Sequence, residues 1–397
     1  IIRERGRHRS APPTHGNDGS DGRPAAQFED SMGRIFWLLC TLLFLSACSS
    51  SPKPNGNEDD DLVNGKDIRG FEHMISALSH NVNEIWGREA LFAGKFDYVK
   101  YTDQYKSRAH IDFSSGHIMV ETVSGIDPRS HLRRAIIETL LTPDDPAEVD
   151  LYSDAEILPG GEPFLYGQVL DNQGQPIRFD WRAERYADYL LNTAMKKRTL
   201  GIRTIFFVDI PMVANHEDRR GYKYASLIRE ASRKYGVAES LIYAVIKTES
   251  SFNPYAVSHA NAYGLMQVIP ATAGRDVYVR VKGKSGQPTR EDLFNPAYNI
   301  DVGTAYLHLL QTVYLVDIQD PRSRRYAVIS AYNGGAGGVL NTFSSDRKAA
   351  PGMINQLSPE AVYQILTEQH PKAEARRYLY KVNQAEKGFK RTLARTG

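Results

Sequence analysis

Apolar residues in the second half of the chain recur every three to four positions, which is the spacing of amphipathic helices. Gly236 follows one such stretch at a helix-stop position, and Pro254 ends another within about one turn. Residues 218–393 are therefore predicted to form a mainly α-helical domain. The expected helices cover residues 223–235, 241–249, 296–314, 325–332, 359–368 and 373–385.

The pattern between residues 65 and 215 mixes helical and alternating periods, which predicts a mixed α/β domain. Alternating segments flank Ser114–Gly116 and Asp171–Gly174, and each pair predicts a β-hairpin. The expected fold class is α+β, with this mixed N-terminal domain preceding the helical one. The expected helices are residues 71–86, 131–141 and 182–197, and the expected strands lie in residues 98–125, 166–170, 177–181 and 203–212.

A short segment near the N-terminus has the pattern of a secretory signal. Met32–Arg34 is basic, residues 35–44 are almost wholly apolar but too few to span a bilayer, and a small-residue cleavage site ends at Cys48. Residues 32–47 are therefore predicted to be a lipoprotein signal peptide, with Cys48 as the lipid-bearing residue. By resemblance to other lipoproteins, Ser49 favours the outer membrane, with the protein facing the periplasm.

Two further segments are set apart by composition. Residues 48–64 are rich in Ser, Pro, Asn and acidic residues, so they cannot bury enough apolar surface to order themselves and are predicted to be a lipid-anchored flexible linker. Residues 1–31 are rich in Arg, His, Gly and Pro without periodicity, and we interpret them as an upstream extension foreign to the protein.

Glu249 is the candidate for acid chemistry, because it continues the apolar face of a predicted helix at its C-terminal end. It lies three residues after Ile246, four after Val245 and seven after Ile242. Burial and the negative end of the helix dipole both disfavour the charged carboxylate and raise its pKa, as a general acid requires. Position alone leaves open the alternative of a Glu at a frayed helix end, turned to solvent.

Several motifs follow Glu249 in a fixed order. Glu249–Pro254 reads Glu-Ser-Ser-Phe-Asn-Pro, Ser258 lies nine residues past the Glu, and Gly264–Gln267 reads Gly-Leu-Met-Gln. Ala331–Asn333 reads Ala-Tyr-Asn, and Glu374-Ala-Arg-Arg-Tyr-Leu contains a late tyrosine. In this order they resemble the lysozyme-like lytic transglycosylases of bacterial cell walls. The late motif departs from the pattern at Ala375 and Leu379, so Tyr378 is the best match for its tyrosine and Tyr380 competes with it.

The layout of the leading domain resembles that of the membrane-bound lytic murein transglycosylase C family, which extends the resemblance over nearly the whole mature chain. The resemblance implies one catalytic carboxylate, Glu249, which acts on the bond between N-acetylmuramic acid and N-acetylglucosamine in peptidoglycan. It implies that Glu249 protonates the glycosidic oxygen and then deprotonates the muramic C6 hydroxyl, which closes a 1,6-anhydro ring without consuming water. The substrate-binding residues it implies are Ser258, Gln267, Tyr332, Asn333 and Tyr378.

Composition limits the cofactors and partners. The two cysteines, Cys40 and Cys48, lie in and directly after the predicted signal, so the soluble part can have neither a disulfide nor a Cys-ligated metal. No His-Glu-x-x-His or clustered His pattern occurs, so a zinc site is not expected. We expect the protein to use no metal and no other cofactor. From residue 221 onward there are 23 Lys and Arg against 14 Asp and Glu, which suits an anionic polymer. For an exported protein that polymer is peptidoglycan and not nucleic acid.

Two other functions remain open at this point. A hydrolase of goose-lysozyme type would share the fold but finish the reaction with water. A non-catalytic wall-binding lipoprotein would keep the fold without the chemistry. The apolar helix face that carries Glu249 argues against the second, and the Gly-Leu-Met-Gln and Ala-Tyr-Asn motifs favour a transglycosylase over the first by resemblance.

Overall fold

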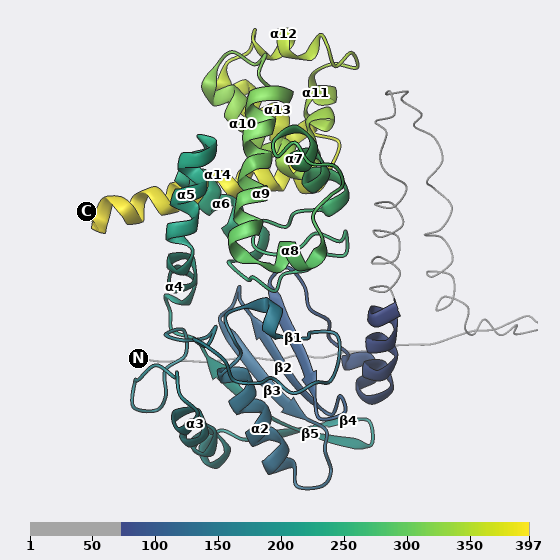
Figure 1. Ribbon diagram of the computed structural model, residues 1–397, viewed down its shortest axis with the longest axis vertical. Helices are drawn as coiled ribbons and strands as arrows, with labels where there is room; N and C mark the ends of the chain where they lie inside the picture. Colours follow the sequence, from purple (N-terminus) through teal and green to yellow (C-terminus); the bar gives the residue numbers. More distant parts are fainter. Residues whose placement is uncertain (1–72, 397) are drawn as a thin grey trace, which may run out of the picture. The chain divides into compact units, whose positions relative to one another are not determined.

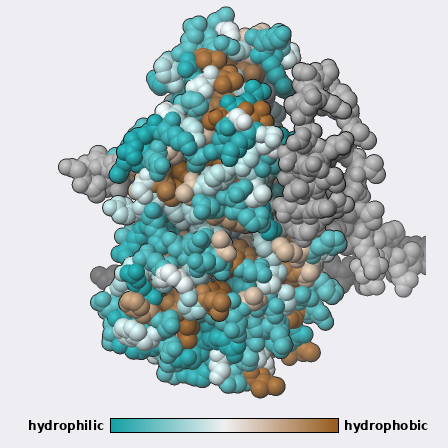
Figure 2. Space-filling model, viewed as in Figure 1, coloured by the Kyte–Doolittle hydropathy of each residue, from teal (hydrophilic) through white to brown (hydrophobic). Residues whose placement is uncertain are grey.

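The computed structural model describes residues 73–396, which belong to one compact unit (Figure 1). The predicted signal peptide, Cys48 and the linker lie outside the described residues. A sheet in the first half and a mainly helical second half confirm the α+β class. Among the described residues, no helix combines the length and apolar character needed to cross a membrane. Figure 2 shows a mainly hydrophilic face with apolar residues in separate groups.

Five antiparallel strands form the sheet, in the order β1-β2-β3-β5-β4. The hairpin predicted around Ser114–Gly116 is confirmed, because β2 and β3 pair across it with Asp112 opposite His117. The strands are β1 (Asp97–Thr102), β2 (Ser107–Asp112), β3 (His117–Thr122), β4 (Lys196–Leu200) and β5 (Arg203–Pro211).

Side chains alternate along each strand, so both faces of the sheet carry apolar residues. Helices cover both faces. α2 (Pro128–Leu140) packs on β2 and β3, and α3 (Asp180–Thr193) packs on α2. Tyr98 of β1 belongs to the apolar core on that side. Its neighbour Val99 belongs to the opposite core, which the helical residues 73–86 supply with Leu78, Val82 and Trp86.

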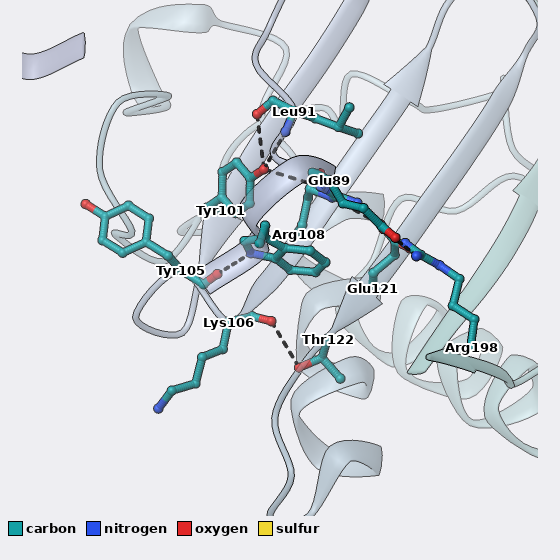
Figure 3. Close-up of polar contacts among 10 residues, drawn as sticks. Glu89, Leu91, Tyr101, Tyr105, Lys106, Arg108, Glu121, Thr122 and Arg198 are labelled. Atoms are coloured by element: carbon teal, nitrogen blue, oxygen red, sulfur yellow. Dashed lines mark hydrogen bonds and ion pairs between the residues drawn. The ribbon is translucent and has the colours of Figure 1, made fainter. Parts of the chain in front are cut away.

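A buried ion network ties the segment after this helix to the sheet (Figure 3). Arg108 Nε donates to the Glu121 carboxylate at 3.0 Å, and both residues are 3% exposed. Arg108 also donates to the Glu89 carbonyl at 2.6 Å, and its guanidinium lies 4.1 Å from the Trp86 ring centroid. Arg198 of β4 donates to the second oxygen of Glu121 at 2.7 Å. These contacts hold η1 (Gly87–Glu89) against the sheet, and the chain leads from there to β1.

The second predicted hairpin is wrong. One isolated bridge joins Leu170 to Pro176, and α3 already begins at Asp180, inside the segment expected to be the return strand. The Asp171 carboxylate instead accepts hydrogen bonds from the backbone N–H groups of Gln173 and Gln175, at 2.9 Å each. Local side-chain bonds of this kind compete with strand pairing and close a loop.

The helical half surrounds α6 (Glu239–Ser250), which packs against α14 (Ala373–Thr396) and α5 (Ala225–Tyr235). All the predicted helices of this half are present. The expected helix 296–314 is divided, because α9 (Pro296–Leu309) gives way to the π-type turn η4 (Leu310–Tyr314). The remaining helices are α4 (His216–Lys223), α7 (Arg275–Arg280), α8 (Arg290–Phe294), α10 (Pro321–Gly334), α11 (Ala336–Phe343), α12 (Ala350–Ile354) and α13 (Pro359–Gln369).

Two residues of the helical half complete the packing of the sheet half. Tyr255 is fully buried in the core of the sheet half, where its ring meets Tyr98 and Phe164 with centroids 5.1 and 5.6 Å away. Arg220 of α4 is also fully buried, and it donates to the carbonyls of Phe113 at 2.9 Å and Ser251 at 3.0 Å. The segment that follows Glu249 is thereby held against the sheet.

Candidate active site

Glu249 lies in the last turn of α6 and is 4% exposed. The apolar residues that precede it on the same helix, Ile242, Val245 and Ile246, are fully buried. Ser251 adopts a left-handed conformation, with φ of 51°, and ends the helix. The apolar spacing therefore predicted the environment of this carboxyl correctly, and the solvent-facing alternative is wrong.

Burial raises the pKa of the Glu249 carboxyl above its usual value. The Lys95 ammonium opposes this shift, and its Nζ lies 3.3 Å from Glu249 Oε2. The Tyr378 hydroxyl also lowers the pKa, whereas the Glu374 carboxylate raises it. The desolvation is the largest of these effects, so the protonated form of Glu249 is favoured to a higher pH than in an exposed Glu.

Two tyrosines that the motifs singled out lie beside this carboxyl. The rings of Tyr332 on α10 and Tyr378 on α14 are nearly parallel, with centroids 6.4 Å apart. The Tyr332 hydroxyl donates to the Met266 carbonyl at 2.8 Å, while the buried Tyr378 hydroxyl has no hydrogen-bond partner among residues 73–396. Burial raises the pKa of both phenols, and the negative charge of Glu249 adds to the shift. Tyr380 is 55% exposed and lines a surface groove beside α6 instead.

The Gly264–Gln267 loop is held from α9 by Asn299. The Asn299 side chain accepts from the Met266 N–H at 2.8 Å and donates to the carbonyls of Tyr263 and Leu293 at 2.8 Å each. Met266 is fully buried. This loop is therefore part of the packed interior of the helical half.

Gln267 turns its amide nitrogen inwards. Its Nε2 donates to the carbonyls of Ala256 at 3.1 Å and Gly264 at 3.0 Å, which uses both amide protons. Its buried Oε1 has no partner within the described part of the chain. A side-chain amide carries both donors and an acceptor, and the two donors of Gln267 are used within the protein. The structure leaves an acceptor.

Ser258 and Asn333 make no hydrogen bond or ion pair with Glu249 in the part of the chain that the structure describes. Ser258 Oγ accepts from the N–H groups of Ala260 at 3.2 Å and Ala262 at 3.1 Å, which leaves its hydroxyl proton to donate outwards. Asn333 follows Tyr332 on α10 and is partly buried.

Other acidic residues near the motifs have structural partners. Asp276 accepts from the Tyr314 hydroxyl at 2.8 Å, and Asp292 closes a capping box with Thr289 at the start of α8. Glu291 pairs with its neighbour Arg290. Within residues 73–396, no group of three His, Cys, Asp or Glu side chains is arranged to hold a metal ion.

Sequence reasoning missed Lys95. It lies about 150 positions before Glu249, outside every motif, in the loop that enters β1. Nothing in its sequence context distinguishes it from other lysines of the first half. Glu374 belongs to the late motif, but its role as a second partner of Lys95, at 3.7 Å, was not predicted.

Both halves of the chain match known protein families. Residues 64–223 match the family model "Membrane-bound lytic murein transglycosylase C, N-terminal domain", and residues 226–354 match "Transglycosylase SLT domain". The membrane-bound lytic murein transglycosylase C of Salmonella paratyphi B is 56% identical over 362 residues, which cover 91% of this chain and all of that protein. The protein of the same name from Klebsiella pneumoniae is 58% identical over 87% of this chain and 96% of its own length.

Likeness to solved structures is more limited. The 70 kDa soluble lytic transglycosylase of Escherichia coli aligns with 41% of this chain and 23% of its own length, at 24% identity and a TM-score of 0.32. A likeness this low carries no argument about the site.

Proposed function

This chain belongs to the membrane-bound lytic murein transglycosylase C family and is a peptidoglycan-cleaving lytic transglycosylase, and we propose that Glu249 performs both proton transfers of its reaction. The observation that carries the proposal is the burial of Glu249, which raises the pKa of its carboxyl. A general acid must hold its proton at the working pH, and desolvation provides for this.

The first step cleaves the β-1,4 bond between N-acetylmuramic acid and N-acetylglucosamine. Glu249 gives its proton to the glycosidic oxygen, and that oxygen leaves with the electron pair of the bond to C1 of the muramic sugar. The substrate's own acetamido oxygen stabilises the oxocarbenium-like centre. This removes the need for a second protein carboxylate of the kind that most glycosidases use.

The second step returns the proton to the enzyme. The Glu249 carboxylate takes the proton of the C6 hydroxyl while the C6 oxygen bonds to C1, which forms a 1,6-anhydro end. Atoms and charge balance without water. The partners of Asp276, Glu291 and Asp292 support a single-carboxylate mechanism, because all three are engaged away from Glu249.

The remaining motif residues would bind the glycan. The free hydroxyl proton of Ser258 suits the acetamido oxygen, and the unpartnered Oε1 of Gln267 suits a sugar hydroxyl or N–H. Tyr332 and Tyr378 lie beside Glu249 and have nearly parallel rings, and Asn333 follows Tyr332 on the same helix. The unused hydrogen-bonding groups of Ser258 and Gln267, and the position of the two tyrosines beside Glu249, support these roles.

The relatives are named as membrane-bound, and we assign the same state to this chain through a lipid on Cys48. Residues 32–47 would be removed as a signal and residues 48–64 would act as the tether. The enzyme would then face the periplasm from the outer membrane, with an accessory domain at 65–215 and a catalytic domain at 218–393. Membrane fractionation of a Cys48→Ala variant tests the anchor, since the variant should appear in the soluble fraction.

Digestion of purified sacculi tests the role of Glu249. The nearly isosteric Glu249→Gln variant cannot supply a proton, so cleavage should be abolished while binding to sacculi persists. Glu239→Gln, at the exposed start of the same helix, serves as the matched control and should cleave normally. Mass spectrometry of the wild-type products should find glycan ends lighter by one water than reducing ends. Reducing ends would instead indicate a hydrolase, and full activity of Glu249→Gln would refute the assignment.

A further inference from the structure

The loop that enters β1 is attached to the turn that follows Glu249. Asn253 Nδ2 donates to the carbonyls of Lys95 at 3.4 Å and Asp97 at 3.5 Å, and the Val257 N–H donates to the Gly94 carbonyl at 3.4 Å. Asn253 is fully buried, and its Oδ1 accepts from the Tyr255 N–H at 3.0 Å. The backbone of Lys95 is therefore held by the same motif segment that begins with Glu249.

The Lys95 side chain reaches back to two carboxylates. Its Nζ lies 3.3 Å from Glu249 Oε2 and 3.7 Å from Glu374 Oε1. The side chain of Glu249 is 5% exposed, that of Lys95 is 29% exposed and that of Glu374 is 71% exposed. Lys95 thus bridges a buried carboxyl on α6 and a solvated one on α14.

The groups that face Glu249 come from three other elements of the described chain. Lys95 lies on the loop before β1, Tyr378 and Glu374 on α14, and Tyr332 on α10. The single lysine of α6, Lys247, is engaged with Glu217 at 2.8 Å. The positive charge in direct contact with Glu249 is therefore supplied by the accessory half of the protein.

We propose that Lys95 is a positioning residue for the cleavage reaction, whose ammonium stabilises the carboxylate that Glu249 becomes when it delivers its proton. The proposal rests on the proposed role of Glu249. The proton of Glu249 moves to the glycosidic oxygen and is replaced by that of the C6 hydroxyl. The ion pair is stronger with ionised than with neutral Glu249, so it favours the transition state of the first step over the ground state.

Glu374 works against this effect. Its carboxylate attracts the Lys95 ammonium and raises the pKa of Glu249, whereas Lys95 lowers it. Removing Lys95 or Glu374 should therefore change the acidity of Glu249 in opposite directions. A loss of general structural support would not produce shifts of opposite sign.

The pH dependence of kcat/KM on a soluble glycan substrate tests the proposal. The value of kcat/KM reports the protonation state of the free enzyme, and cleavage needs protonated Glu249. It therefore falls as the pH rises through the pKa of Glu249. In Lys95→Met the pKa rises further, so this fall should move up by about one pH unit. Because the acid is then weaker, the low-pH plateau should drop by roughly threefold. Lys95→Arg keeps the charge and should restore the wild-type profile.

Two further variants complete the series. Glu374→Gln should move the fall in kcat/KM to lower pH. Lys223→Met is the control for loss of an ion pair, because Lys223 pairs with Asp144 and does not contact Glu249. Its profile should match that of the wild type.

If kcat/KM of Lys95→Met falls at the same pH as that of the wild type, Lys95 has only a structural role and the proposal is overturned. This holds whatever the plateau value of kcat/KM. If thermal unfolding shows that Lys95→Met does not fold, Glu374→Gln decides, and an unmoved profile there overturns the proposal equally. The role of Glu249 fails separately, because it fails only if Glu249→Gln still cleaves.

Discussion

At the scale of single residues, the acidity of Glu249 is set by groups that lie far apart in the sequence. The carboxyl shares the buried face of α6 with apolar residues, and this part of its environment follows from local spacing. Lys95, Glu374 and Tyr378 then adjust the pKa from positions that local spacing cannot connect to Glu249. The residue type and its burial were predictable, but its charged partners were not.

Tyr378 and Tyr380 can be distinguished by replacing each with Phe. The Tyr378 hydroxyl is buried beside Glu249 and lowers its pKa, so Tyr378→Phe should leave Glu249 a weaker acid and reduce kcat/KM by roughly threefold. The alkaline fall in activity should also move to higher pH. Tyr380→Phe is the matched control, because this hydroxyl belongs to a side chain that is 55% exposed. Steady-state kinetics on soluble glycan measures both, and a loss confined to Tyr380→Phe would transfer the motif role to Tyr380.

At the scale of elements, the site depends on a loop that one helix holds in place. Asn299 of α9 binds three backbone groups around the Gly264–Gln267 loop. Gly264 has φ of +70°, and a Cβ there would lie 2.5 Å from both Asn299 Nδ2 and the Leu293 carbonyl oxygen. The motif glycine is therefore required by backbone conformation and by close packing together.

Replacement of this glycine should cost more than its backbone conformation alone explains. Gly264→Ala should lower the free energy of unfolding by about 3 kcal/mol, through left-handed strain and overpacking. Gly174→Ala is the control, because Gly174 has φ of +74° with nothing within 4 Å of a Cβ, and it should lose about 1 kcal/mol. Urea unfolding measures the difference. Equal losses at the two positions would show that the contacts with Asn299 and the Leu293 carbonyl are both relieved by local movement.

The elements that periodicity predicted are the long ones. Spacing was sufficient for α6, α9 and the β2–β3 hairpin, whereas short helices such as α8 and α12 were not predicted. A helix of five residues is not stable by itself and forms through its tertiary contacts. The failed hairpin at Asp171 has a related cause, because the carboxylate makes backbone hydrogen bonds that the alternating pattern does not reveal.

At the scale of the whole molecule, the two halves share parts of their cores. Tyr255 comes from the segment after Glu249 but packs inside the sheet half. Its hydroxyl donates to the Pro143 carbonyl, and Arg220 joins α4 to the end of β2 and to Ser251. The same interlocking brings Lys95 to Glu249. The accessory half is thus part of the environment of the proposed acid.

Because Tyr255 packs inside the sheet half, its replacement should also destabilise the sheet. Tyr255→Ala should cost about 3–5 kcal/mol of unfolding free energy, the usual loss for a fully buried aromatic residue. Amide hydrogen exchange in β1 and β2 should accelerate with it. Tyr222→Ala, at a side chain that is 83% exposed, should change stability by less than about 0.5 kcal/mol. Unchanged exchange in β1 and β2 would mean that the halves unfold independently.

The sequence by itself determined the α+β class, the helix that carries Glu249, the burial of that residue and the order of the motifs. These depend on period, composition and spacing, which are local properties of a chain. Tertiary structure alone decided that Lys95 contacts Glu249, that Tyr378 lies beside it and Tyr380 does not, and that Gln267 offers an acceptor. Charge interactions and packing act through space, so they appear only when segments distant in sequence have been brought together.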